Sequence, residues 1–376
     1  MESEKKVEYI ELIYDLIFVY IIGRNNHLLH VMENGFIEPG AFLTYTLMAL
    51  IILQIWYYTT LFINRYGEND KRMYIAIFVN MYLLYFMARG IRSDWQGEFY
   101  TFNGAWLLIL LNIALQYWLQ LKKTEAAKLW ESAQIKRNIF TILIQAAVIV
   151  VSFPVFRATG IPLSPIALLF GIVMAISSSR VNSLVPVDFR HLTERVMLYV
   201  VFTFGEMIIV IADYFEGGLS ASTIYFSACA FLIVAGLFMS YGVLYDRLID
   251  RDTVTNGSAY MILHVFLILS LNLMTAALEF MQQQHVKALP KNVLLISSFV
   301  LYFVMMFLIM RFNKTEFRRT GKGTRLFFAG MGVFVVLMVI CFSNPVISIG
   351  VTVLYIWAVF VSLLKMSEQH DIRTVQ

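Results

Sequence analysis

Two carboxylates lie in segments that are otherwise apolar, at matching distances along the chain. Asp15 lies within the run 12–22, and Glu206 lies within the run 196–212. A charged side chain at membrane depth costs at least about 2.5–3.5 kcal/mol on insertion scales, so such residues usually face a protein interior or a water-filled path. The two acids are 191 positions apart in a chain of 376 residues, which predicts a duplicated fold with one acid in each half.

Each acid belongs to a polar stripe on an expected helix. Glu8, Glu11 and Asp15 are spaced by three and four residues, so they share one helix face. The second stripe, on the segment 193–213, contains residues that project within about a quarter-turn of one another: Arg195, Tyr199, Thr203, Glu206 and Asp213. Because an apolar helix does not turn its one polar stripe toward lipid, we expect the two stripes to face each other or a shared cavity.

The chemistry that these residues suggest is proton or cation exchange. Asp15 and Glu206 are the expected carriers, since buried carboxylates are often tuned for proton transfer. Arg195 is the expected counter-ion of these acids, and the acid with which it pairs would depend on conformation. In the alternative interpretation, Glu11 and Arg195 are solvated at the cytoplasmic interface, while Asp15 and Glu206 only make hydrogen bonds between helices.

A geometric expectation follows from these charges. The helix that carries Glu11 and Asp15 and the helix that carries Arg195 should be adjacent, with the guanidinium within reach of Glu11 or Asp15. An arginine at this depth without an acid would be a costly unpaired charge, or its side chain would have to extend to the headgroups.

Histidines provide weaker candidates. His191 and Glu194 are three residues apart and could ligate a metal ion, but the rest of a coordination shell cannot be found, and a first-turn acid also complements the helix dipole. His27 closes the first apolar segment, where it could sense pH or bind a cation, or simply be a solvated helix end. We therefore expect neither a metal nor a cofactor.

Composition places the chain in the membrane class. It is 59% hydrophobic and 14% charged, with a mean hydropathy of +0.71, whereas soluble domains are about 25% charged. The first residues lack the features of a cleavable signal peptide. The sequence predicts an all-α integral membrane protein whose twelve transmembrane helices lie at 9–31, 41–62, 73–90, 102–121, 139–156, 161–178, 193–213, 221–244, 257–281, 292–312, 325–343 and 346–365.

The distribution of basic residues gives the orientation. Of the 29 Lys and Arg residues, 22 fall at the N-terminus, the C-terminus or the even-numbered connections, six fall on the other side, and Arg195 lies just inside the seventh helix. By the positive-inside rule, the N- and C-termini are both cytoplasmic. The connection 122–138 is basic and contains Trp130, which predicts a short surface helix on the inner leaflet.

The even number of helices per half has a consequence for symmetry. Six helices return the chain to its starting side, so the halves 1–190 and 191–376 would be parallel repeats about an axis along the membrane normal. Twelve evenly spaced helices would also overlay at half-length without a true duplication.

The sequence also argues against several classes of protein. It contains no Gly-rich phosphate loop, no His-Glu-x-x-His pair and no Gly-x-Ser-x-Gly elbow, so we do not expect an enzyme. Its net charge of +4 comes from short loops between spans and does not indicate nucleic-acid binding. An ion channel is disfavoured because neither a selectivity-filter pattern nor a regularly spaced arginine helix is present.

A family resemblance rests on two motifs. The first reads Glu11-Leu-Ile-Tyr-Asp15-Leu-Ile-Phe-Val, with His27 twelve residues after the aspartate. It resembles the Glu-Leu-x-x-Asp-Leu-x-Phe-Val motif of the bacterial low-temperature-requirement A family. The chain departs from the family at 23–26, where Gly-Arg-Asn-Asn replaces the usual small and apolar residues before the histidine.

The second motif reads His191-x-x-Glu194-Arg195, followed after nine residues by Gly205-Glu206. It resembles the Glu-Arg…Gly-Glu helix near the middle of that family's chains. The resemblance covers the whole chain in length and span count. It implies a multi-pass protein of the bacterial plasma membrane, and the family name describes a growth phenotype in the cold rather than an activity.

These observations favour a proton- or cation-coupled secondary transporter of an unknown small solute, with its acids on the first and seventh helices. The alternative is a non-transporting, lipid-interacting membrane protein that supports growth at low temperature, because basic inner loops attract anionic lipids. Membrane lipids and a small solute are the expected partners. The sequence leaves the oligomeric state open.

Overall fold

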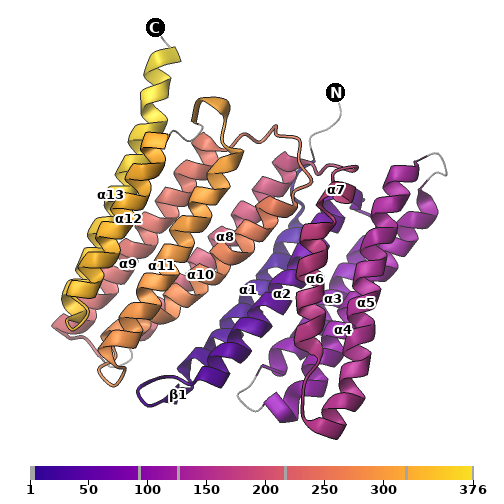
Figure 1. Ribbon diagram of the computed structural model, residues 1–376, viewed down its shortest axis with the longest axis horizontal. Coiled ribbons are helices and arrows are strands. Elements are labelled where there is room, and N and C mark those ends of the chain that lie inside the picture. Colours follow the sequence, from indigo (N-terminus) through magenta and orange to yellow (C-terminus); the bar gives the residue numbers. More distant parts are fainter. Residues whose placement is uncertain (1–4, 92–94, 125–127, 216–217, 318–320, 375–376) are drawn as a thin grey trace. The chain divides into compact units, whose positions relative to one another are not determined.

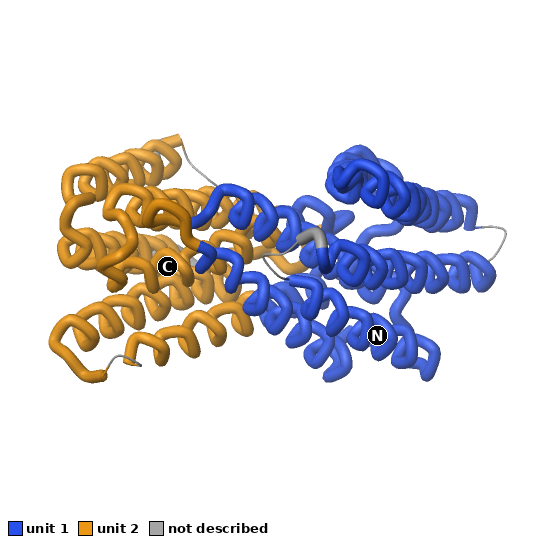
Figure 2. The backbone as a smooth tube through the Cα atoms, turned by 90° about the horizontal axis from the view of Figure 1, so that it is seen from below, with its two compact units in different colours: residues 1–31, 37–199, 254–262 blue, residues 32–36, 200–253, 263–376 orange. Residues whose placement is uncertain are grey.

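The structure is a computed structural model that describes residues 5–91, 95–124, 128–215, 218–317 and 321–374. It is almost entirely helical in these residues (Figure 1). The chain divides into two compact units, coloured separately in Figure 2. Unit 1 contains residues 1–31, 37–199 and 254–262, and unit 2 contains residues 32–36, 200–253 and 263–376.

Unit 1 consists of helices packed around a central one. Its α-helices are α1 (Tyr9–Asn26), α2 (Pro39–Tyr66), α3 (Lys71–Arg89), α4 (Trp95–Lys123), α5 (Leu129–Thr159), α6 (Ser164–Ser177), α7 (Ser179–Asn182) and the first half of α8 (Phe189–Val210). A 3₁₀ turn, η1 (His27–His30), continues α1. The central helix is α2, which packs against α1, α4 and α6.

The burial of α2 follows from its sequence. Every residue from 51 to 64 is buried, since this stretch is apolar or aromatic on all sides apart from a few amides and hydroxyls. The helix starts at Pro39, a residue favoured in the first turn, and the Glu38 side chain accepts hydrogen bonds from the backbone N–H groups of Gly40 and Ala41.

Unit 2 is a second set of long helices. It contains the remainder of α8, then η2 (Ile211–Phe215), α9 (Ala221–Val243), the π-helical turn η3 (Leu244–Leu248), most of α10 (Ser258–Gln282), α11 (Ala288–Ile309), η4 (Met310–Phe312), η5 (Thr315–Phe317), α12 (Gly321–Ile340) and α13 (Pro345–Thr374). Helices α9 and α13 pack closely at Gly236, where a Cβ would lie 2.4 Å from the side chain of Ile356. Any larger residue at this position would force the Ile356 side chain or the two helices to shift.

Two very short strands form a hairpin, β1 (Met32–Glu33) and β2 (Phe36–Ile37). Asn34 and Gly35 connect them with φ values of 52° and 80°. An Asn-Gly pair with positive φ at both positions is the preferred two-residue hairpin turn. The sequence prediction treated 9–31 as one helix and did not predict the hairpin that follows it.

All twelve expected segments are helical in the described residues, although their ends differ from the predicted ones. Nine helices of the described chain are long and apolar enough to cross a membrane: α2, α4, α5, α8, α9, α10, α11, α12 and α13. The other three are α1, α3 and α6; α6 has only 14 residues, and α1 carries three charged residues within 18. The protein therefore has multiple membrane-capable helices, while the total of twelve crossings stays a prediction.

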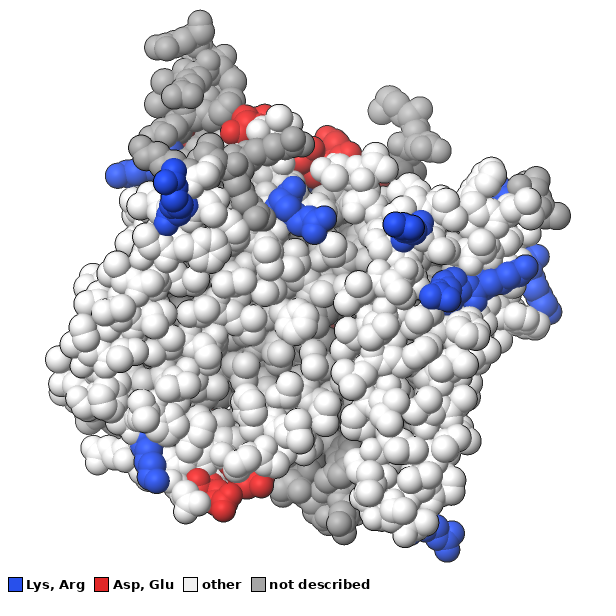
Figure 3. Space-filling view, in the orientation of Figure 1, with Lys and Arg blue, Asp and Glu red and all other residues white. Residues whose placement is uncertain are grey.

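The surface of α1 also has the pattern of a membrane helix. Tyr9, Ile13, Leu16 and Tyr20 are exposed, whereas the buried face carries the acids Glu11 and Asp15. This arrangement is the reverse of a soluble amphipathic helix, whose charges face water. Figure 3 shows the same pattern more broadly, with charged side chains near helix ends and uncharged residues along the helix flanks.

The segment 122–138 differs from the predicted surface helix. Helix α5 already begins at Leu129, so Trp130 and the following basic residues form the first turns of a 31-residue helix. Residues 125–127 lie outside the described part of the chain. The prediction was wrong because amphipathic turns can continue directly into an apolar span.

The boundary between the compact units falls within α8 and not in a loop. The predicted halves, 1–190 and 191–376, were drawn from hydropathy and spacing. The duplication and its parallel symmetry stay predictions.

Candidate functional site

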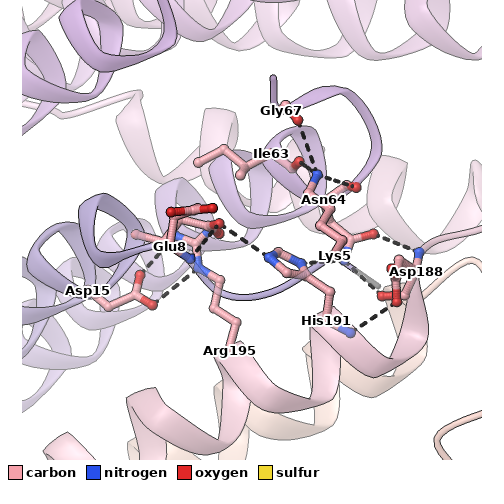
Figure 4. A network of polar contacts seen from close by, with 10 residues as sticks. Lys5, Glu8, Asp15, Ile63, Asn64, Gly67, Asp188, His191 and Arg195 are labelled. Atoms are coloured by element: carbon pink, nitrogen blue, oxygen red, sulfur yellow. Dashed lines mark hydrogen bonds and ion pairs between the residues drawn. The ribbon is translucent and has the colours of Figure 1, made fainter. Parts of the chain in front are cut away.

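The candidate site lies in unit 1, where one face of α1 meets the first turns of α8 (Figure 4). Glu11 and Asp15 are four residues apart on α1, so their carboxylates lie one turn apart on the same face. Both are buried, with Asp15 at 0% and Glu11 at 1% exposure.

The start of α8 positions the opposing side chains. The Asp188 side chain accepts a hydrogen bond from the backbone N–H of His191 at 3.0 Å, as an N-cap residue does. From this start, His191 and Arg195 lie one turn apart on the same face of α8.

Arg195 joins the two acids. Its Nε and Nη2 atoms donate to Asp15 Oδ2 and Oδ1 at 3.2 and 2.9 Å, and its Nη1 atom donates to Glu11 Oε2 at 2.7 Å. The guanidinium is fully buried. The planar fork of arginine matches a carboxylate in this two-bond geometry, so the predicted pairing of Arg195 with Glu11 or Asp15 is confirmed for both acids. The α1 backbone packs mainly against α2 and α3, and the long Arg195 side chain reaches the two acids from α8.

Asp15 receives a third hydrogen bond from the central helix α2. Trp56 Nε1 donates to Asp15 Oδ1 at 3.0 Å. The Trp56 ring stacks on Tyr199 of α8, with 4.6 Å between ring centroids. Both rings are fully buried. This packing fixes the indole N–H toward the carboxylate.

Glu11 is held by His191 as well as by Arg195. His191 Nε2 lies 3.2 Å from Glu11 Oε1, and His191 Nδ1 lies 3.0 Å from Nδ2 of Asn64. The amide NH₂ of Asn64 can only donate, so Nδ1 accepts and the ring proton is on Nε2, from which it is donated to Glu11.

A lysine lies at the edge of the site, at the end of α2. Lys5 Nζ donates to the carbonyl oxygens of Ile63, Asn64 and Gly67 at 2.6, 3.0 and 3.3 Å. Carbonyls in the last turn of a helix have no partner within the helix, and a cation there also complements the helix dipole. Burial lowers the pKa of Lys5, and the neighbouring Glu11 partly offsets this effect.

The two negative charges of the site exceed the single positive charge of Arg195. Two carboxylates, Glu11 and Asp15, share one guanidinium. Lys5 interacts electrostatically with Glu11 from the edge. Removing one member of a buried ion pair is strongly unfavourable, because the other charge is left uncompensated. A carboxylate of this set can therefore gain or lose a proton only if its charged partner keeps, or finds, another partner of opposite charge.

Other residues expected at the site lie elsewhere. Glu206 and Thr203 are further along α8, in unit 2, and Glu206 is half-buried. Among the described residues, no hydrogen bond joins the half-buried Glu194 to the cluster. His27 is exposed in η1, at the other end of α1 from Glu11, so the structure does not bring it to the acids.

Sequence reasoning missed four residues of the site. Asp188 had a usable signal, because an aspartate directly before the first apolar residue of a helix is a typical N-cap. Lys5 and Asn64 lie at segment ends, where polar residues are ordinary, and Trp56 lies in an aromatic-rich run. For these three, only the packing of α1, α2 and α8 reveals the role.

Two further features bear on what the site can do. In the described part of the chain, no group of three or more His, Cys, Asp or Glu residues could hold a metal ion.

Two hollows in the described residues have volumes that include open solvent. One, of about 270 Å³, is lined by residues of α2, α3 and α4. The other, of about 190 Å³, is lined by residues of α8, η2 and α10. Neither is lined by Glu11, Asp15, Arg195 or Glu206.

The match to a known family covers nearly the whole chain. Residues 6–361 match the model of the bacterial low temperature requirement A protein (LtrA) family. The chain belongs to this family, and the matched region includes every residue of the site except Lys5. A comparison with curated proteins finds no match. The protein is thus a multi-pass membrane protein of a bacterial family.

Proposed function

We propose that this protein is a proton- or cation-coupled secondary transporter of a small solute in the bacterial plasma membrane. The observation that carries the proposal is the fully buried set of Glu11, Asp15 and Arg195, in which two carboxylates share one guanidinium. Charged groups inside membrane proteins are rare and usually belong to ion or substrate pathways.

The shared arginine makes proton exchange feasible without an unpaired cation. If Glu11 takes up a proton, Arg195 keeps its two hydrogen bonds to Asp15. If Asp15 takes it up, Arg195 keeps its bond to Glu11. Each exchange changes the charge of the site by one while the arginine stays paired, which limits the energetic cost of changing protonation in a buried site.

Glu206 is the proposed second carrier. Among the described residues, its buried Oε2 atom has no hydrogen-bond partner. A buried carboxylate oxygen without a donor is costly, and a proton or a cation would relieve that cost. Each acid would then be a separate exchange site, Asp15 in unit 1 and Glu206 in unit 2.

The proposal is tested by neutralising each acid. Asp15→Asn and Glu206→Gln should each abolish proton-driven solute currents in proteoliposomes, screened with a panel of small solutes across a pH gradient. Each variant should also fail to restore growth in the cold to a strain that lacks the gene. The exposed Asp213 on η2 provides the control, since Asp213→Asn should behave as wild type. If both variants, at wild-type expression, fully restore growth, coupling through these acids is wrong.

A second candidate is supported by the packing of the site. Glu11, Asp15 and Arg195 are almost completely enclosed by protein, and neither hollow is lined by them. A dry, packed ion cluster also suits a non-transporting protein that interacts with lipid and supports the membrane in the cold. This function predicts that no solute in the panel drives a current through the wild type, and that growth in the cold follows the folded amount of each variant.

A further inference from the structure

Asn64 makes a reciprocal contact with the backbone of Asp188. Its Oδ1 atom accepts from the Asp188 N–H at 3.0 Å, and its Nδ2 atom donates to the Asp188 carbonyl at 2.9 Å. These two bonds determine which end of the amide is oxygen, because a backbone N–H can only donate and a carbonyl can only accept. The contact ties the last turn of α2 to the residue that caps α8.

The orientation of the amide constrains His191. The second hydrogen of Asn64 Nδ2 points to His191 Nδ1 at 3.0 Å. Neutral imidazole has one donor and one acceptor nitrogen, whereas the protonated ring has two donors. A proton on Nδ1 would therefore face the NH₂ group of Asn64, and the two donors would repel each other.

The amide can relieve this conflict only by turning over. Oδ1 would then accept from His191 Nδ1, but Nδ2 would face the Asp188 N–H and Oδ1 would face its carbonyl. Both bonds between Asn64 and the Asp188 backbone would be lost. A doubly protonated His191 is therefore incompatible with the two hydrogen bonds between Asn64 and the Asp188 backbone.

We propose that His191 is a proton-accepting switch, and that Asn64 is the positioning residue that couples its protonation to the contact between the end of α2 and the start of α8. In this step Nδ1 accepts a proton from water, and no other covalent bond forms or breaks. Nε2 keeps its hydrogen bond to Glu11. Any role of this switch in transport rests on the proposed function, whereas the protonation switch itself does not.

Charged groups surround His191 from each neighbouring element. Glu11 on α1 accepts from Nε2, and Arg195, one turn along α8, occupies the other oxygen of Glu11. The Asp188 side chain accepts from the backbone N–H of His191, not from its ring. Lys5 donates to the carbonyls at the end of α2. The ring of His191 therefore lies between the Glu11 carboxylate, which accepts from Nε2, and the Asn64 amide, which donates to Nδ1.

The experiment is nuclear magnetic resonance of the full chain in nanodiscs, with ¹⁵N-labelled histidine and aspartate and assignment through His191→Gln. At neutral pH, His191 in the wild type should show a protonated Nε2 and an unprotonated Nδ1. As the pH falls, the second proton should appear together with loss of protection of the Asp188 amide against hydrogen exchange. These readouts need no substrate.

Two variants of Asn64 separate the switch from simple packing. Asn64→Leu removes the opposing donor, so His191 should bind its second proton about tenfold or more tightly than in the wild type. Asn64→Asp can accept from both the Asp188 N–H and His191 Nδ1, so the doubly protonated ring should form while the Asp188 amide stays protected. The exposed His27 is the internal control, and its titration should not change in either variant.

Several results would overturn the switch. A wild-type His191 with its proton on Nδ1 would show that the hydrogen bonds are assigned incorrectly. A second proton on His191 with full protection of the Asp188 amide would show that the two contacts are compatible. Unchanged His191 titration in both Asn64 variants would remove the positioning role. If the switch is observed and no solute is transported, the proposed function fails and the switch stands.

Discussion

Asp15 and Glu206 occupy matching places in the sequence, but their surroundings differ. Asp15 is fully buried and accepts three hydrogen bonds, two from Arg195 and one from Trp56. Glu206 is half-buried, and among the described residues its Oε2 atom is buried without a hydrogen-bond partner. One carboxylate is fully satisfied by its protein partners, and the other is not.

This difference separates two roles that the sequence had treated alike. A buried carboxylate with an arginine partner is fixed in place, because removing either partner leaves an uncompensated charge. A carboxylate with an unsatisfied oxygen can bind a proton or cation with less disturbance of its surroundings. We therefore expect variants near Asp15 to change the stability of the fold more than a variant of Glu206.

The largest effect is expected for Arg195→Met. This change leaves Glu11 and Asp15 without their shared cation, and removing one partner of a buried ion pair costs about 3–5 kcal/mol. The free energy of unfolding, measured by denaturant titration in mixed micelles, should fall by that amount. Arg24→Met is the matched control, since Arg24 is exposed on the same helix as the acids. Equal stability of the two variants would contradict the structural importance of the cluster.

A smaller loss is expected for Trp56→Phe. The ring can still stack on Tyr199, but the donor to Asp15 is lost, and a hydrogen bond to a charged group contributes about 1.5–3 kcal/mol. The same titration measures this loss. Trp118→Phe is the control, because Trp118 is exposed and the ammonium of Lys122 lies over its ring in a cation–π pair worth about 0.5–1 kcal/mol. A loss no larger than that of the control would show that the indole N–H contributes nothing to Asp15.

Lys5→Met should lower the free energy of unfolding by about 0.5–1.5 kcal/mol, because the carbonyls at the end of α2 lose a hydrogen-bond donor. Burial lowers the pKa of Lys5. Between this folded value and the ordinary lysine value, the unfolded chain binds more protons, so the stability of the wild type should rise with pH in this window. The difference between wild-type and Lys5→Met unfolding curves across mildly alkaline pH measures both effects. A difference that shrinks as the pH rises would contradict the sign.

The smallest effect on stability is expected for Glu206→Gln. The amide removes a charge that lacks a donor at one oxygen, so the free energy of unfolding should stay within about 0.5 kcal/mol of the wild type. Under the proposed function, coupled solute currents should nevertheless be lost. Unfolding curves and currents measured on one preparation test both statements. A destabilisation comparable to that of Arg195→Met would place Glu206 in the same class as Asp15.

The sequence was informative wherever a charge had to be explained within an apolar helix. Because an unpaired arginine at membrane depth is costly, Arg195 could be assigned to Glu11 or Asp15 before the structure was known. The same reasoning could not find Trp56 or Asn64, because an indole or an amide in a helix has many acceptable surroundings. It also grouped His27 with the site, although it is exposed at the other end of α1.

Helix ends show a similar division. The apolar runs placed the long helices correctly, but the start of α5 at Leu129 and the Asn34-Gly35 hairpin were missed. Runs of hydropathy report which residues avoid water, and they are insensitive to polar turns that extend a helix beyond the apolar region. The hairpin had a local signal, the Asn-Gly pair, but hydropathy alone does not detect such a turn.

The sequence by itself determined the membrane class, the membership of α1 and α8 in a charged site and the need of Arg195 for an acid. These conclusions follow from transfer energies, which depend only on residue type and neighbours along the helix. The tertiary structure decided that Arg195 serves two carboxylates, that Trp56 and His191 hold one each and that Asn64 sets the proton position on His191. Hydrogen-bond direction depends on which atoms of distant segments meet within about 3 Å, and the spacing of residues along one chain does not contain that information.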